Sequence, residues 1–104
     1  MKFEGFRSSM EVESGMLKVY RKNIGIQDQN VNIPLSQITA VNMIKPSLAG
    51  NGVIYVLTPS SKLSTSVLVT RNDALKDAGS MAFTKKQLKE AESFVEYLNS
   101  EICK

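Results

Sequence analysis

The chain has 104 residues, of which 42% are hydrophobic and 22% are charged, and its formal net charge is +3. These values are typical of one soluble globular domain, and we expect residues 1–104 to form it. They exclude a membrane-spanning helix, because no apolar run approaches about 20 residues. They also argue against nucleic-acid binding, since the basic residues are scattered.

The first third of the chain is predicted to form short strands separated by turns. Brief strands are expected at residues 3–7 and 10–13, with a turn at Ser14-Gly15. From residue 16 to 26, apolar and polar residues alternate, which predicts a strand or a hairpin with one face toward a core. The polar segment 27–32 is predicted to be a loop.

The middle of the chain alternates strand and turn signals. Residues 33–35 are expected to end a strand, 36–39 to form one helical turn, and 40–45 to form a new strand. Asn51-Gly52 indicates a hairpin turn. Residues 52–58 are apolar on both faces, which predicts a central strand with at least partial cover on each side.

Three elements are predicted in the last part of the chain. We expect strands at residues 63–70 and 80–83, with either a loop or a broken turn around Ala74-Leu75 at residues 71–79 between them. Residues 84–102 then have the period of an amphipathic helix. Its apolar stripe is expected to comprise Leu88, Ala91, Phe94, Val95, Leu98 and Ile102.

The start of this helix carries two opposing signals. Thr84 and Gln87 have the spacing of a capping box, which favours a helix beginning at Thr84. Lys85 and Lys86 in the first turn and Glu101 near the end instead oppose the helix dipole. We therefore expect the helix to depend on docking its stripe against an apolar surface.

Three segments carry a resemblance to a known family: residues 33–41, residues 52–56, and residues 81–84 where they lead into the helix. They resemble the bacterial pleckstrin-homology-like (PH-like) domains of uncharacterised type. The resemblance implies an α+β fold: a small, strongly bent antiparallel β-barrel of six or seven strands, capped by one C-terminal α-helix. It supplies no catalytic residue.

The residue inventory argues against an enzyme. The chain has no histidine, the commonest general base and metal ligand, and its one cysteine is Cys103. We expect no metal site and no cofactor. The N-terminus lacks the apolar core of a signal peptide, so we expect a cytoplasmic location.

Two basic groups are candidate anion-binding residues. Lys18, Arg21 and Lys22 lie where phosphoinositide-binding pleckstrin-homology domains place basic residues. Lys85 and Lys86 lie on the first turn of the helix, where free N–H groups could help to hold an anion. The alternative for both groups is a solvated surface.

Alternation along the strands also predicts an apolar outer wall. If Ile54 points inward, Tyr55 and Leu57 point outward, and the same reasoning places Tyr20 and Leu68 outside. Such a wall would be a candidate partner-binding surface. The alternative is that a loop, or the N-terminal segment with its phenylalanines, covers it.

These observations favour a non-enzymatic module for protein interaction or assembly, with an unknown protein partner or a homo-oligomer. The alternative is a domain that binds an anionic membrane surface or a lipid headgroup, which would make peripheral membrane contact.

Overall fold

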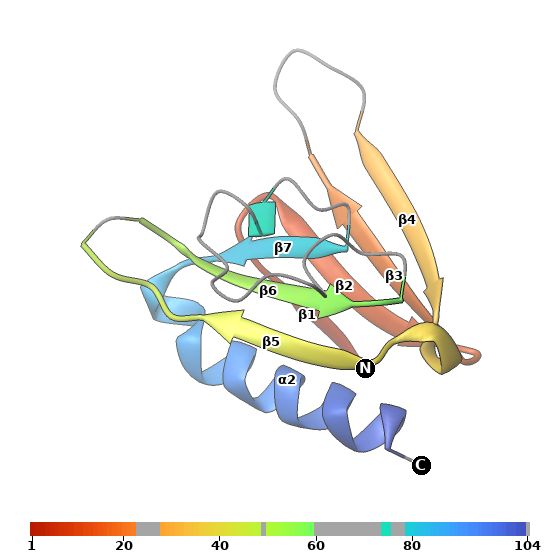
Figure 1. Cartoon of the computed structure of the whole chain (residues 1–104). Helices are drawn as coiled ribbons and strands as arrows, with labels where there is room; N and C mark the ends of the chain where they lie inside the picture. The colour runs from red at the N-terminus through yellow and green to blue at the C-terminus, as the bar shows by residue number, and fades with distance from the viewer. Residues whose placement is uncertain (23–27, 49, 60–73, 76–78, 104) are drawn as a thin grey trace.

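Two antiparallel sheets and one C-terminal helix make up the computed structural model of the chain (Figure 1). The structure describes residues 1–22, 28–48, 50–59, 74–75 and 79–103. The predicted strand at residues 63–70 and the predicted continuation of the first hairpin at 23–26 lie outside the described residues.

The first sheet has four strands in the order β1-β2-β3-β4. Their bounds are β1 Lys2–Glu4, β2 Ser8–Glu13, β3 Met16–Arg21 and β4 Gln29–Pro34. Ser14 and Gly15 form the predicted two-residue turn between β2 and β3. The inner face carries Phe3, Met10, Leu17 and Val19, all buried.

The loop predicted at residues 27–32 is wrong, because β4 occupies most of that segment and pairs with β3. Val31 and Ile33 pack against the core, whereas Gln29, Asn30 and Asn32 are exposed. Asn30 and Asn32 misled the prediction because they lie on the solvent-facing side of a strand, and Gln29 is exposed at the start of that strand.

The second sheet has three strands in the order β5-β6-β7. Their bounds are β5 Ala40–Ile44, β6 Gly52–Leu57 and β7 Ser80–Phe83. A short 3-10 helix, η1 (Leu35–Gln37), precedes β5 where one helical turn was predicted. The predicted strands at 40–45, 52–58 and 80–83 are therefore confirmed within a residue at their ends.

Gly52 is part of β6 and not of the turn that the Asn51-Gly52 signal predicted. The chain reverses before Asn51, where Ser47 and Gly50 exchange backbone hydrogen bonds of 3.0 and 3.2 Å. A Cβ atom on Gly52 would lie only 2.3 Å from the ring of Phe83, the residue opposite it on β7. This glycine therefore makes room for a buried aromatic ring.

The C-terminal helix α2 (Leu88–Ile102) follows a 3-10 turn, η3 (Lys85–Gln87), and lies along β5 (Figure 1). Its predicted stripe is confirmed, since Ala91, Phe94 and Leu98 are fully buried. The ring of Phe94 stacks on that of Phe3, with the ring centroids 5.8 Å apart. Phe3 therefore belongs to the inner core and does not cover an outer wall.

The sheets meet at the turn between β1 and β2. The Phe6 N–H donates to Ala82 O of β7 at 2.8 Å, and Ser8 Oγ bonds the same carbonyl at 3.1 Å. A Cβ atom on Gly5 would lie 2.2 Å from Ala82 O, so only glycine permits this approach. Within the described residues this corner is an isolated bridge, and the strands do not close into a barrel.

Candidate functional site

The predicted apolar outer wall is covered where the structure describes it. Tyr55 is only 7% exposed, and it packs with Val53 against Ala74 and Leu75. The prediction that Tyr55 lies exposed is therefore wrong. The alternative of a covering segment is correct, but the cover comes from residues 74–75 and not from the N-terminus.

The other three residues of the predicted wall do not form a patch with Tyr55. Leu57 is half-buried and packs against the same small cluster. Tyr20, on the separate first sheet, is half-buried and donates its hydroxyl proton to Asp28 Oδ2 at 2.7 Å. Leu68 lies outside the described residues. The alternation along β6 was predicted correctly, but residues 74–75 cover the face that carries Tyr55.

The basic residues predicted on the early strand are separated by the structure. Lys18 Nζ lies 3.2 Å from Glu13 Oε1 in a surface ion pair. Arg21 is half-buried and donates from Nη1 to Ser80 Oγ at 3.4 Å. Lys22 alone remains at the exposed end of the sheet, where its N–H donates to Arg7 O at 2.9 Å.

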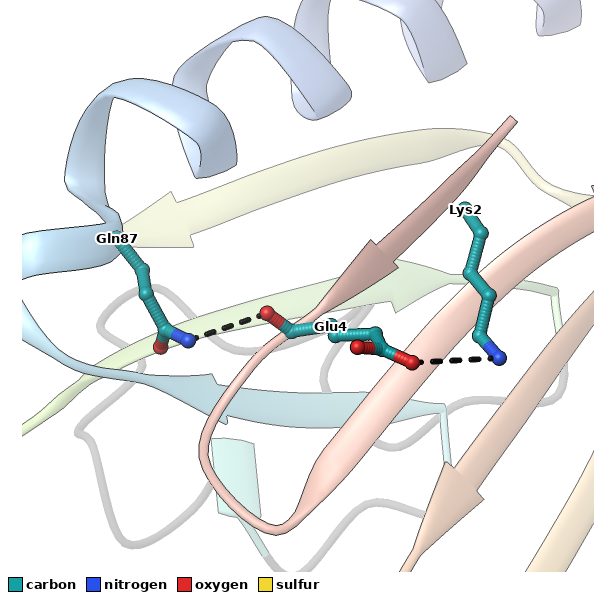
Figure 2. A network of polar contacts seen from close by, with 3 residues as sticks. All are labelled: Lys2, Glu4 and Gln87. Carbon is teal, nitrogen blue, oxygen red and sulfur yellow. Dashed lines mark hydrogen bonds and ion pairs between the residues drawn. The ribbon is translucent and has the colours of Figure 1, made fainter.

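At the helix start, both lysines are exposed, but backbone N–H groups there are engaged. The predicted capping box between Thr84 and Gln87 is present: the Thr84 N–H donates to Gln87 Oε1 at 2.9 Å, and the Gln87 N–H also donates to Thr84 O at 3.0 Å. Figure 2 shows that Gln87 Nε2 also donates to Glu4 O, at 3.2 Å, while the Glu4 carboxylate pairs with Lys2. Thr84 and Gln87 thus satisfy these two N–H groups themselves, and Lys85 and Lys86 lie beside them as exposed surface charges.

Strand pairing brings three turns to one end of the molecule. Gly52 pairs with Phe83, so the turn before Gly52 and the helix start after Phe83 leave the second sheet together. Phe6 bridges Ala82, which places the β1–β2 turn beside them. Figure 1 shows the β5–β6 turn and the helix start projecting on the same side.

We call this region the basic end, and we define it by its exposed cations and apolar side chains. The cations are Arg7, Lys22, Lys85 and Lys86, and the apolar side chains are Phe6 and Leu48. Leu48 is fully exposed (101%) at the tip of the β5–β6 turn, and Phe6 is 44% exposed. The Arg7 guanidinium lies 5.5 Å from the centroid of the Phe6 ring, at cation–π distance.

Acidic residues gather at the opposite end. The helix begins beside Glu4 and runs past Met1, which shares a hollow with Ser93. Met1 O in turn accepts from the Val12 N–H near the end of β2. Glu13 follows on β2, and Glu96 and Glu101 follow on the helix, so acidic residues lie toward this end together with Lys18, the ion-pair partner of Glu13. The exposed Glu4 lies at the basic end, beside the helix start, so both ends carry charges of both signs.

A hollow of about 270 Å³ lies between β1 and α2. Its lining residues are Met1, Lys2, Phe3, Lys89, Glu90, Ser93 and Phe94. The two phenylalanines are the buried stacked pair, so the floor of the hollow is part of the core. The residues around the hollow include Lys2, Lys89 and Glu90, so it favours neither an anionic nor a cationic ligand.

Among the described residues, no group of three or more histidine, cysteine, aspartate or glutamate side chains could hold a metal ion. No helix in this part of the chain is long and apolar enough to cross a membrane. Comparisons with protein-family models, curated proteins and solved structures gave no match.

Sequence reasoning missed Phe6, Arg7 and Leu48, because each lies in a turn of no recognisable motif. One signal was present for Leu48. A large aliphatic residue between Ser47 and Gly50, in a tight turn, has no strand neighbour to cover it.

Proposed function

We propose that this protein is a non-enzymatic binding module of PH-like fold that associates peripherally with anionic membrane surfaces through its basic end. The observation that carries the proposal is the convergence of four exposed cations on the end that also presents the fully exposed Leu48. A cytoplasmic location, where anionic lipid headgroups face the protein, belongs to the same proposal.

The magnitudes support reversible attachment. Each lysine or arginine close to an anionic leaflet is worth about 1 kcal/mol. Four such residues together would give an affinity near millimolar from charge alone, at roughly 4 kcal/mol.

The proposal also includes the fold type, a PH-like barrel. The described residues form a four-stranded sheet, then a three-stranded sheet, and then a C-terminal helix docked on the core. This supports the proposal, because the resemblance implies six or seven strands capped by such a helix. The helix covers the inner core residues, as a helix capping such a barrel would.

Vesicle sedimentation tests the membrane proposal. Binding is expected to vesicles of phosphatidylcholine with phosphatidylglycerol, to be absent without the anionic lipid, and to weaken as salt shortens the Debye length. Lys85→Gln should weaken binding about fivefold. Lys18→Gln removes the same charge far from the basic end and should change it little; equal losses would show that only net charge matters.

A second candidate function, assembly with a protein partner or a second copy, is favoured by one observation. β4 carries no charged residue, and in the described part of the chain it pairs with β3 alone. Proteins commonly protect such edges with lysine or proline, and here only the last residue, Pro34, does so. Sedimentation equilibrium distinguishes the candidates: self-association without vesicle binding would favour assembly.

A further inference from the structure

We infer that the basic end inserts Leu48 into the bilayer, with Phe6 beside the headgroups, so that its partner is a lipid membrane and not a free anionic headgroup. This inference rests on the membrane proposal above and adds an apolar anchor to it.

Leu48 is the most exposed large apolar residue of the described chain, at the tip of the β5–β6 turn. Two backbone hydrogen bonds between Ser47 and Gly50 close this turn. Full exposure of a leucine in water forgoes burial of its whole apolar surface. A polar residue would suit a solvated turn tip better.

The turn that carries Phe6 is also fixed by hydrogen bonds. The Phe6 N–H is bonded to Ala82 O, and Ser8 Oγ also accepts from the Ala82 N–H at 3.3 Å, so the turn is fixed on β7. Arg7 next to it has φ 52°, a left-handed conformation that is uncommon for a residue other than glycine. The turn therefore holds an aromatic ring and a guanidinium side by side at the surface.

The positive charge at this end of the molecule indicates which kind of partner the two apolar side chains contact. A protein groove would require apolar contact without a preferred sign. Strand pairing instead brings the turns that carry Leu48 and Phe6 to the end of the molecule that also carries Arg7, Lys85 and Lys86. Apolar residues that enter the acyl region, surrounded by cations at headgroup level, are typical of proteins that bind the surface of an anionic bilayer.

A tryptophan reporter tests the inference directly, because the chain contains no tryptophan. Emission of Leu48→Trp should shift to the blue and be quenched by brominated lipids when vesicles containing phosphatidylglycerol are added. Ser100→Trp, exposed on the far half of the helix, should show neither change. Soluble glycerol 3-phosphate should not shift the Leu48→Trp emission.

Affinity provides an independent measurement that does not depend on the reporter. Leu48→Ser should weaken vesicle binding about tenfold at constant salt, whereas Leu48→Met should retain it. Neither substitution should alter the fold, since the Leu48 side chain is fully exposed. Salt-sensitive binding with an unshifted reporter and an unchanged Leu48→Ser affinity would overturn insertion and leave the electrostatic proposal standing. Absence of any vesicle binding would overturn both.

Discussion

At the scale of single residues, Tyr20 and Asp28 show how the fold reassigns a predicted contact residue. The hydrogen bond to Asp28 raises the pKa of Tyr20 above 10.0, and desolvation and the Asp28 charge act in the same direction. Tyr20 therefore joins the end of β3 to the residue just before β4, and its hydroxyl already has a partner.

This pair predicts a pH dependence. A raised pKa means that the folded state favours the protonated phenol, so the stabilisation is present below about pH 10 and is lost as the pH rises through the folded pKa. Asp28→Ala should lower the pKa of Tyr20 toward its ordinary value. Titration of ¹³C-labelled tyrosine by NMR measures it, and an unchanged titration curve would contradict the hydrogen bond.

At the scale of elements, the C-terminal helix is held by its buried face and not by its charges. Ala91, Phe94 and Leu98 are fully buried against both sheets, while the 3-10 turn that precedes the helix carries lysines that oppose the dipole. Tertiary packing of the buried face therefore stabilises the helix, which its local sequence would not stabilise alone.

Truncation of the two faces should separate these contributions. Leu98→Ala should lower the free energy of unfolding by about 2–5 kcal/mol, because it empties a fully buried site. Glu96→Ala, on the exposed face, should change it by less than about 0.5 kcal/mol. Urea melts of both variants measure the difference, and similar losses would mean that the docked face is wrongly assigned.

At the scale of the whole molecule, four exposed cations lie toward one end, and two of them lie at the helix start, where they oppose the helix dipole. Lys85 and Lys86 lie where a helix prefers acidic residues, yet they belong to the basic end. The membrane proposal gives a reason for residues that destabilise the helix they begin.

The double substitution Lys85→Glu with Lys86→Glu should therefore act in opposite directions on stability and binding. The free energy of unfolding should rise by about 0.3–1 kcal/mol per residue, because acidic residues suit the helix N-terminus. Vesicle binding should be abolished. Urea melts and sedimentation on the same preparation measure both, and a variant that loses both together would indicate a structural role for the lysines.

Local patterns were sufficient for much of the fold. The period of Leu88 to Ile102 determined the helix and its buried stripe, and the apolar run at 52–58 determined a central strand. These two predictions were correct because the spacing of apolar residues within a single segment indicates both its secondary structure and its buried face.

Only tertiary structure decided the rest. The polar segment at Gln29 became a strand because β3 offered a pairing edge, and Tyr55 became core because residues 74–75 cover it. The basic end arises in the same way. Arg7, Leu48 and Lys85 stand far apart in the chain, and only the pairings of Gly52 with Phe83 and Phe6 with Ala82 bring their turns together. Long-range hydrogen bonds between strands leave no local signal, so a surface assembled by them is absent from the sequence pattern.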